Sequence, residues 1–239
     1  MLASPNFPPK DSLSLRTCIS AGEALPPQIA RSFKEKTGID ILDGIGSTEM
    51  LHIFLSNRPG EWRHGTTGKA VPGYELKLVD EQGNEVKRGE LGELLIKGPS
   101  AANGYWNNRA KSRGTFVGEW TRSGDKYSQD ADGFYVYGGR TDDMLKVSGI
   151  WVSPAEVEAA LVSHEAVLEA AVVGQEDDNK LVKPKAFVVL KPGKKATDEE
   201  LKNHVKEKLA PYKYPRWIEF AAELPKTATG KIQRFKLRA

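Results

Sequence analysis

The chain has 239 residues, of which 39% are hydrophobic and 28% are charged, and its formal net charge is +3 at pH 7. This composition is typical of a globular chain with one or two domains and excludes an intrinsically disordered protein. No hydrophobic run approaches the about 20 residues of a membrane-spanning helix, and the first residues lack a signal-peptide pattern.

The single cysteine, Cys18, excludes an internal disulfide framework and favours a reducing compartment, so we expect a cytoplasmic protein. Its position in the run LRTCIS predicts a buried structural side chain rather than a nucleophile. The charge is uneven, because residues 180–239 hold 16 Lys and Arg but only 6 Asp and Glu. This basic part could bind a phosphorylated partner or form a solvated surface. It lacks interleaved aromatic residues, so nucleic acid is not expected.

Residues 1–59 predict a strand, a helix and a second strand. The hydrophobic run Leu15–Ser20 is followed by a helical pattern at Pro26–Lys36, which Gly38 ends, and then by the run Ile39–Leu42. This order and spacing are typical of two parallel strands in an α/β sheet.

Residues 60–141 predict a small antiparallel β subdomain. Apolar residues from Tyr74 to Leu78 alternate with charged ones, Glu93–Lys97 is a second apolar run, and Phe134–Tyr137 follows an Asp-Gly turn. The stretch GTTGK at 65–69 lacks the spacing of a phosphate-binding loop and indicates a turn.

Residues 142–239 predict a compact α+β domain. The sequences SPAE at 153–156 and TDEE at 197–200 predict capping boxes, each at the start of a helix. The runs Ala166–Val173 and Lys185–Leu190 predict strands. The expected fold is therefore mixed α/β and α+β, with a domain boundary inside the glycine-flanked, charged stretch GGRTDDMLKVSG.

The stretch DGIGSTEM at 43–50 could bind phosphate. Its glycines let backbone N–H groups approach an anion, its hydroxyls can donate further hydrogen bonds, and Glu49 could hold a Mg²⁺ that bridges phosphates. The same residues could equally form a strand–turn–helix corner with Ser47 as the N-cap.

Two further stretches are open to the same choice between chemistry and local structure. In PKTATGK, Lys231 could stabilise charge on a carboxylate and a phosphate, or the loop could simply be solvated. In TRSGDKY, Asp125 could accept both hydroxyls of a ribose or could cap a turn.

The four histidines are His52, His64, His164 and His204, and none has the spacing of a metal site. We expect His164 and His204 at the surface. His52 follows the glycine-rich stretch and is the one expected near a ligand.

The order of the motifs is more informative than each alone. They are SAGEAL (20–25), DGIGSTEM (43–50), GELGELLIKGPSAANGYWN (89–107), WTRSGDKY (120–127), GGRTDDMLKVSG (138–149) and PKTATGK (225–231). Over essentially the whole chain this series resembles the later motifs of the adenylate-forming enzymes, which include acyl- and aryl-CoA ligases, peptide-synthetase adenylation domains and luciferases. DGIGSTEMLHIFLSNRPG and the last thirty or so residues resemble in particular the benzoate-CoA ligase group.

The resemblance implies a two-step reaction. A carboxylate and Mg·ATP give an acyl-adenylate and pyrophosphate, and the coenzyme A sulfur then displaces AMP. The implied cofactors are ATP, Mg²⁺ and coenzyme A, the implied substrate is an aromatic carboxylate, and neither a nucleic-acid nor a membrane partner is expected.

The resemblance also assigns roles to positions of this sequence. ATP and AMP binding is assigned to Gly22, Glu23, Ala24, Asp43, Gly44, Ile45, Gly46, Ser47, Thr48, Asp125 and Arg140. Catalysis is assigned to Lys231, Lys146, Thr48 and Glu49, with Glu49 also the metal ligand. The aryl pocket is assigned to Gly46, His52 and Ile53, the hinge to Asp142, and the coenzyme A side to Lys146, Ser148 and Gly149.

The sequence departs from the family pattern in two respects. Ile45 stands where many members carry an aromatic residue that stacks on adenine. The family's glycine-rich phosphate loop is also absent. We therefore interpret the chain as the C-terminal part of the large domain (1–141) followed by the whole small domain (142–239). Alone it is expected to be inactive and to associate through exposed sheet edges. The alternatives are a non-catalytic nucleotide- or coenzyme A-binding module and an enzyme that transfers the acyl group to a carrier protein.

Overall fold

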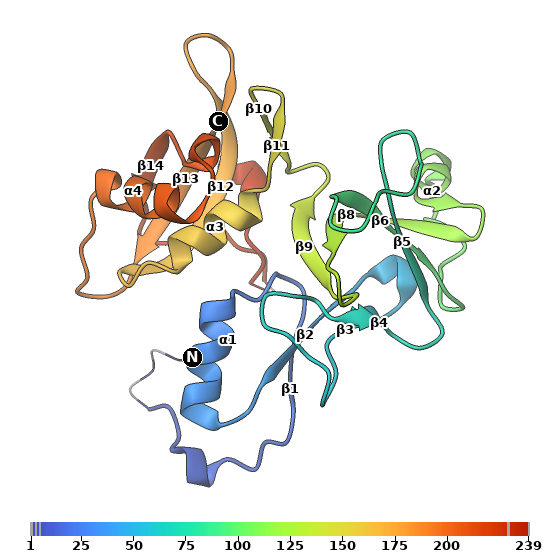
Figure 1. Cartoon of the computed structure of the whole chain (residues 1–239), viewed down its shortest axis with the longest axis horizontal. Coiled ribbons are helices and arrows are strands. Elements are labelled where there is room, and N and C mark those ends of the chain that lie inside the picture. The colour runs from blue at the N-terminus through green and yellow to red at the C-terminus, as the bar shows by residue number, and fades with distance from the viewer. Residues whose placement is uncertain (1, 3, 5, 229, 239) are drawn as a thin grey trace. The chain divides into compact units, whose positions relative to one another are not determined.

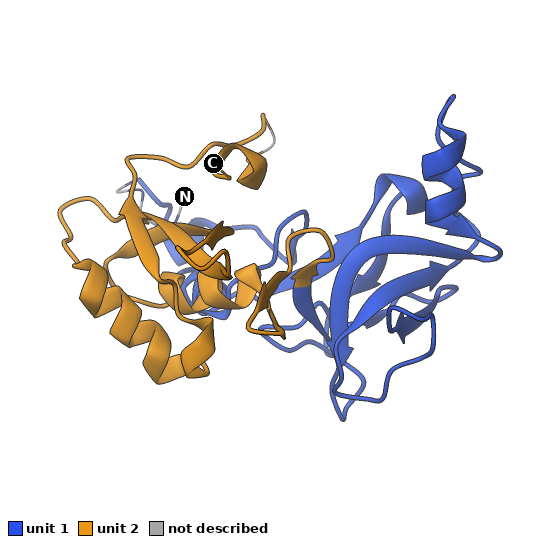
Figure 2. Cartoon of the chain, turned by 90° about the horizontal axis from the view of Figure 1, so that it is seen from above, with its two compact units in different colours: residues 1–138 blue, residues 139–239 orange. Residues whose placement is uncertain are grey.

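The computed structural model describes residues 2, 4, 6–228 and 230–238. It divides into two compact units, residues 1–138 and residues 139–239 (Figure 2). The sequence pattern places the domain boundary slightly later, after residue 141, and that placement stays a prediction. The two units are described separately below as unit 1 and unit 2.

The first sheet of unit 1 has four strands in the order β1-β2-β3-β4 (Figure 1). Its strands are β1 (Cys18–Ser20), β2 (Ile41–Gly46), β3 (Ile53–Ser56) and β4 (Lys69–Ala70). Helix α1 (Pro27–Thr37) connects β1 to β2, and these two strands pair in parallel with Ser20 opposite Asp43. The predicted parallel pair is confirmed. Gly38, at φ 77°, ends the helix as expected, because glycine takes the left-handed conformation without strain.

The second sheet of unit 1 is antiparallel, as predicted. Its order is β5-β6-β8-β7, with β9 also paired to β8. The strands are β5 (Glu75–Val79), β6 (Gly92–Lys97), β7 (Phe116–Val117), β8 (Trp120–Gln129) and β9 (Tyr135–Arg140). Three short helices complete this part of the chain: η1 (Lys10–Ser12), η2 (Thr48–Met50) and α2 (Arg109–Thr115).

One hydrophobic cluster joins the two sheets of unit 1. Phe54 and Leu55 come from β3 and Met50 from η2, whereas Leu94 and Ile96 come from β6, and all are essentially inaccessible to solvent. Because this cluster lies directly beneath η2 and β6, it fixes the main chain on which the polar residues of the following section stand.

Unit 2 is built on a three-stranded sheet in the order β12-β13-β14 and on a separate hairpin, β10-β11. The strands are β10 (Leu145–Val147), β11 (Ile150–Val152), β12 (Val167–Glu176), β13 (Val182–Leu190) and β14 (Trp217–Phe220). The helices are α3 (Pro154–Val162), α4 (Asp198–Lys208), η3 (Pro211–Lys213) and η4 (Arg234–Lys236). The mixed α/β and α+β fold expected from the sequence is confirmed.

Both faces of the three-stranded sheet are covered. Val172 belongs to the cluster that includes Leu161 of α3 and Leu201 of α4. Its neighbour Val173 belongs to a second cluster, which includes Leu224 and is therefore packed against the C-terminal segment. This alternation follows from the two-residue period of a strand.

The two predicted capping boxes differ in the structure. At α4, the Glu200 N–H donates to Thr197 Oγ1 (3.2 Å) and the Thr197 N–H donates to Glu200 Oε2 (2.7 Å), so the box is complete. At α3, Ser153 Oγ accepts the Glu156 N–H, but the Glu156 carboxylate accepts from Lys213 Nζ at 2.6 and 2.7 Å. The reciprocal half of that prediction is wrong because a charge-assisted pair engages the glutamate.

None of the helices in the described ranges has the length and hydrophobicity needed for a bilayer crossing.

Candidate functional site

The DGIGSTEM stretch forms the end of β2 and the corner that follows it. Asp43 to Gly46 continue the strand, and Ser47 caps η2 by accepting the Met50 N–H at 3.3 Å. The predicted corner with Ser47 as the N-cap is confirmed, with both glycines still in the strand. Thr48 is left exposed at the corner.

The two glycines of β2 lie close to β3 and to the segment that precedes it. A Cβ on Gly46 would lie 2.5 Å from the main-chain oxygen of His52, where the register of β2 and β3 shifts. A Cβ on Gly44 would lie 2.9 Å from the hydroxyl of Ser56. The contact at Gly46 is with the main chain and requires a glycine, whereas at Gly44 the Ser56 hydroxyl could move and the nearest main-chain atom is 3.3 Å away.

Glu49 is half-buried and held by a loop far away in the sequence. The Tyr105 hydroxyl donates a 2.5 Å hydrogen bond to Glu49 Oε1, and the Ala102 N–H donates to the Glu49 main-chain oxygen at 2.7 Å. Partial burial opposes ionisation, but the Tyr105 hydroxyl and the neighbouring main-chain N–H and Ser47 groups outweigh it, so the pKa of Glu49 is lowered. Glu49 is therefore an oriented carboxylate at neutral pH.

Next to Gly46, the side chains of His52, Tyr74 and Ser100 form a chain of polar contacts that the sequence did not reveal. His52 Nδ1 lies 2.7 Å from the Ile53 oxygen, and His52 Nε2 lies 3.1 Å from the Tyr74 hydroxyl. The Tyr74 hydroxyl is 2.7 Å from Ser100 Oγ, which donates to the Met50 main-chain oxygen at 2.6 Å. These contacts orient the exposed His52 ring beside the half-buried Ile53.

Asp43 has an unusual environment. Its Oδ1 is buried and has no hydrogen-bond partner among the residues that the structure describes. Burial raises the pKa of Asp43 from an ordinary 3.8 to about 7, although hydrogen bonds from Thr67 and the Gly44 main chain act in the opposite direction. A buried acceptor without a donor is suited to a ligand N–H.

Asp43 and Asp125 share a buried neighbour, Tyr127. The Tyr127 hydroxyl lies 3.3 Å from Thr67 Oγ1, and Asp125 in β8 is only 7% exposed. Burial raises the pKa of Tyr127 well above its usual value, and the nearby charges of Asp125 and Asp43 add to that effect. Thr67 lies in the GTTGK stretch that was predicted to be a turn only, so its place in this cluster was missed.

The SAGEAL stretch lies at the same sheet edge as Asp43. Ser20 of β1 pairs with Asp43 of β2, and Gly22, at φ 96°, begins the exposed loop that continues through Glu23 and Ala24. The structure therefore places this loop at the carboxyl end of β1, where its parallel pairing with β2 ends, and open α/β sheets bind ligands at such carboxyl ends.

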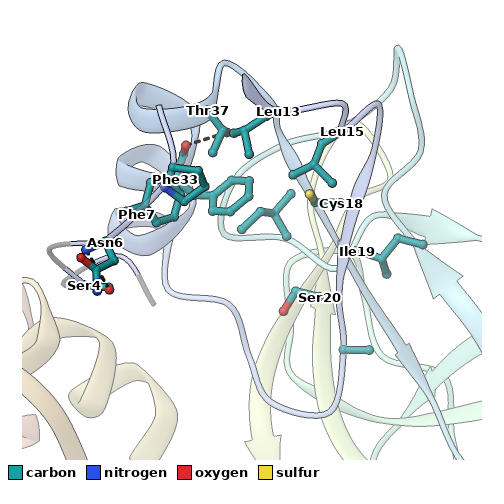
Figure 3. A pocket seen from close by; sticks show the side chains of 13 residues that line it. Ser4, Asn6, Phe7, Leu13, Leu15, Cys18, Ile19, Ser20, Phe33 and Thr37 are labelled. Atoms are coloured by element: carbon teal, nitrogen blue, oxygen red, sulfur yellow. Dashed lines mark hydrogen bonds between the residues drawn. The ribbon is translucent and has the colours of Figure 1, made fainter. Parts of the chain in front are cut away.

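A separate cavity of about 610 Å³ lies between the segment before β1 and helix α1 (Figure 3). Leu13, Leu15 and Phe33 line it together with Cys18. Cys18 is thus half-buried against this cavity, so the prediction of a buried side chain is wrong, and its structural rather than nucleophilic role stays a prediction. The assigned catalytic and nucleotide-binding positions do not line this cavity.

In unit 2, Lys231 lies exposed in a small closed loop. Its main-chain N–H donates to Thr227 Oγ1 at 3.1 Å, and the Thr227 N–H donates to the Lys231 oxygen at 2.8 Å. Gly230 stands at φ 88°, and Lys226 forms a β-bridge with Ile232 on the other side. Local bonds therefore close the PKTATGK loop and leave the lysine side chain exposed.

Lys146 lies on the hairpin β10-β11, opposite Trp151. Its Nζ is 5.6 Å from the Trp151 ring centroid, within reach of a cation–π interaction. Ser148 (φ 51°) and Gly149 (φ 86°) form the turn, with two successive positive φ values as a tight hairpin requires. Lys183 Nζ donates to Ser148 Oγ at 3.4 Å.

The predicted hinge, Asp142, is exposed in the segment between β9 and β10, where its Oδ1 accepts from Arg140 Nε at 3.3 Å. His164 and His204 are not simply surface residues. Their rings meet edge-on at 5.0 Å, and His204 Nε2 lies 2.9 Å from Ser163 Oγ. Partial burial, together with the charge of His164, lowers the pKa of His204.

The described residues hold no cluster of three or more His, Cys, Asp or Glu side chains that could bind a metal by itself. Glu49 is the carboxylate that the structure offers at the η2 corner. One carboxylate fits Mg²⁺, which usually keeps several waters and takes its remaining ligands from substrate phosphates.

Comparison with known proteins identifies the family. The sequence signature described as "AMP-binding enzyme" matches residues 1–106, and that of the "AMP-binding enzyme C-terminal domain" matches residues 156–231. Benzoate–CoA ligase of Thauera aromatica is 65% identical over 243 residues, which cover 100% of this chain and 46% of the relative. The 4-hydroxybenzoate–CoA/benzoate–CoA ligase of Rhodopseudomonas palustris is 56% identical over 230 residues, covering 94% of this chain and 42% of the relative.

Solved structures agree with this assignment. A benzoate CoA ligase from Burkholderia xenovorans LB400 has 62% sequence identity and a TM-score of 0.94, covering 100% of this chain and 48% of that chain. The anthranilate CoA ligase AuaEII, solved with anthranoyl-AMP, has 58% identity and a TM-score of 0.91, covering 94% of this chain and 44% of that chain. The chain thus spans about half the length of the relatives it matches. It belongs to the AMP-binding enzyme family.

Proposed function

We propose that this chain carries the nucleotide-contacting and acyl-transfer residues of an aryl-CoA ligase. The reaction joins benzoate or a close analogue to coenzyme A through an acyl-adenylate, uses ATP and Mg²⁺, and releases pyrophosphate and AMP. The observation that carries the proposal is the pairing of Ser20, at the carboxyl end of β1, with Asp43 of β2, whose Oδ1 has no donor within the described part of the chain.

The nucleotide would be held at this edge of the sheet. An adenine amino group can donate to Asp43 Oδ1, which accepts from none of the residues that the structure places, and the exposed loop of Gly22, Glu23 and Ala24 offers main-chain groups at the same edge. The aliphatic Ile45 would pack against the base. Asp125 would accept the ribose hydroxyls, and Arg140 would assist, as the family resemblance implies.

The phosphates would be held at the η2 corner. The hydroxyls of Ser47 and Thr48 would donate to phosphate oxygens, and Glu49, ionised and oriented by Tyr105, would ligate the Mg²⁺. The metal supplies charge neutralisation on the phosphates. Tyr105 keeps the carboxylate in a fixed orientation before any substrate arrives.

The aromatic acid would lie against Gly46, Ile53 and the ring of His52. Gly46 is exposed and carries no side chain, because the main chain of His52 approaches it on the other side. His52 supplies the polar group, and its orientation is set by the Tyr74 hydroxyl at 3.1 Å.

The two lysines would act in different steps. The Lys231 ammonium would stabilise the negative charge that develops on the phosphate and carboxylate oxygens during adenylation. Lys146, with Ser148 and Gly149 on the β10-β11 hairpin, would serve the attack of the coenzyme A thiol, and Asp142 would be the hinge between the two arrangements. That Lys231 and Lys146 lie on separate, independently closed loops supports this division.

A chimera tests the proposal directly. This chain replaces the matched part of the Thauera aromatica benzoate–CoA ligase, and the parent enzyme is assayed in parallel. With benzoate, ATP, Mg²⁺ and coenzyme A, the chimera is expected to release pyrophosphate and form benzoyl-CoA. The isolated chain is expected to do neither.

Other outcomes separate the alternatives. A folded chimera that binds ATP but makes neither benzoyl-adenylate nor benzoyl-CoA would show that this chain is a binding module. A chimera that makes benzoyl-adenylate but transfers the acyl group only to a carrier protein would assign it to the carrier-dependent enzymes.

A further inference from the structure

A largely buried ion pair begins three residues after Lys231. Arg234, three positions after the lysine, donates from Nε to Glu158 Oε1 (3.0 Å) and from Nη2 to Glu158 Oε2 (2.8 Å). Glu158 lies on α3 and is only 9% exposed. A two-point contact between arginine and carboxylate fixes direction as well as distance.

The glutamate is itself fixed by the sheet. Glu158 Oε1 also accepts the main-chain N–H of Val172 at 2.8 Å. Val172 lies on β12, an edge strand of the three-stranded sheet. The carboxylate therefore joins three parts of unit 2: helix α3, the edge of the sheet and the C-terminal segment.

The arginine also reaches the segment next to the predicted hinge. Arg234 Nη1 lies 4.0 Å from Asp143 Oδ2, and Arg238 donates to Asp143 Oδ1. Asp143 directly follows Asp142. The C-terminal segment is thus tied by charge both to α3 and to the residue beside the hinge.

Hydrophobic contacts anchor the chain before and after the Lys231 loop, but they do not set the direction in which the loop points. Leu224 is buried before the loop, and Ile232 and Leu237 pack after it, all against the same sheet face. Such contacts are non-directional. A hydrogen-bonded ion pair is what can give the exposed Lys231 side chain a defined direction.

We propose that Glu158 and Arg234 are positioning residues for Lys231, and that Asp143 links this pair to the hinge segment. The proposal rests on the proposed function, because it assumes that Lys231 serves adenylation. It concerns residues for which neither the motifs nor the family resemblance gave a role. Glu158 and Arg234 act through the loop and touch no substrate.

The first test uses the isolated chain and needs no activity. Glu158→Gln keeps the shape of the side chain but removes the charge that pairs with Arg234. Hydrogen exchange at the main-chain N–H groups of Thr227, Lys231 and Gln233 is expected to become about 10-fold faster, because a charge-assisted bond that restrains the loop is lost. Exchange within α4 is expected to remain unchanged.

The matched control is Glu156→Gln. Glu156 lies on the same helix and also accepts from a cation, Lys213, at 2.6 Å. The Glu156 carboxylate pairs with Lys213 of η3 and not with Arg234 of the C-terminal segment. Its substitution is expected to leave exchange in the loop unchanged.

The second test uses the chimera with the Thauera aromatica enzyme and separates the two half-reactions. Glu158→Gln and Arg234→Gln are expected to lower the kcat of benzoyl-adenylate formation by about 10- to 100-fold with little change in the KM for ATP. Formation of benzoyl-CoA from supplied benzoyl-adenylate is expected to stay near the unsubstituted rate. Arg234→Lys, which keeps the charge but not the two-point contact, is expected to fall between.

The results distinguish the two proposals. If the unsubstituted chimera is inactive, the proposed function fails, while the exchange measurement still decides whether the pair restrains the loop. If Glu158→Gln alters neither loop exchange nor adenylation, or slows both half-reactions equally, the positioning role is wrong. An effect of Glu156→Gln equal to that of Glu158→Gln would also overturn it, since any charge loss on α3 would then suffice.

Discussion

The hydroxyl of Tyr105 donates a 2.5 Å hydrogen bond to the carboxylate of Glu49, 56 residues earlier in the chain. The same loop also supplies the Ala102 N–H to the Glu49 main-chain oxygen. The GYW segment before α2 and the DGIGSTEM corner are therefore one structural element, although the sequence presents them as two motifs.

Tyr105→Phe should raise the pKa of Glu49 toward its ordinary value, which a carboxyl-carbon NMR titration measures. A carboxyl group with a lowered pKa stabilises the fold above its ordinary pKa, and that contribution disappears as the pH falls through its value in the folded state. The variant should therefore lose about 1 kcal/mol at neutral pH and less below about pH 4. The same change at Tyr212, in unit 2, serves as the control, and an unchanged Glu49 titration would contradict the prediction.

Asp43→Asn should stabilise the protein increasingly as the pH rises. The pKa of Asp43 is raised to about 7 by burial, so the unfolded chain loses this proton near pH 4 while the folded chain keeps it until about pH 7. The free energy of unfolding of the parent protein therefore falls as the pH rises from about 4 to about 7. The advantage of the variant should grow by about 3 kcal/mol from about pH 5 to about pH 8.

Urea unfolding of both proteins at these pH values measures the effect of Asp43→Asn. Asp178→Asn makes the same chemical change at an exposed site and should show no such trend. A constant difference between Asp43→Asn and the parent at all pH values would contradict a raised pKa.

Gly68→Ala should destabilise unit 1 far more than Gly83→Ala. Both glycines have nearly the same positive φ, 89° and 88°, so the conformational strain of an alanine is matched at about 1 kcal/mol. At Gly68 the new Cβ would lie 2.1 Å from the backbone of Ser56 and Asn57, whereas nothing lies within 4 Å at Gly83. Thermal unfolding should show that Gly68→Ala lowers the free energy of unfolding by at least about 3 kcal/mol. Equal decreases for Gly68→Ala and Gly83→Ala would contradict the prediction, because the main chain at Ser56 and Asn57 would then move aside at little cost.

In the chimera, Lys231→Ala and Lys146→Ala should each slow a different half-reaction of the proposed function. Loss of the Lys231 ammonium should slow adenylation by about 10²–10³-fold and spare thioester formation from supplied benzoyl-adenylate. Lys146→Ala should show the opposite pattern. Pyrophosphate release and benzoyl-CoA formation measure the two steps, and an equal loss of both in each variant would contradict separate roles.

Local rules predicted much of the fold. The capping residues at Thr197 and Ser153 place α4 and α3 correctly, and Gly38 ends α1 where expected. These signals work because a cap or a left-handed glycine satisfies backbone groups within a few residues. The parallel β1-β2 pair followed from spacing in the same way.

Long-range pairs explain what the sequence could not show. Glu156 pairs with Lys213 instead of completing its cap, and β2 continues through Gly46 because the main chain of His52 packs against it. In the candidate site, the partners of Glu49 and Asp43 come from segments whose motifs pointed elsewhere, Tyr105 and Thr67. Such pairings depend on tertiary contact and leave no periodic trace in the sequence.

The contact of Glu158 with β12 has a consequence for self-association. An outer strand exposes N–H and C=O groups that can template a foreign strand and start aggregation. The Val172 N–H on the outer side of β12 already donates to the Glu158 carboxylate, so it is not available to pair with a strand of another chain. In unit 1, β1 stands at the end of its sheet with Ile19 66% exposed, so if chains do stack on one another, this strand is where contact should begin.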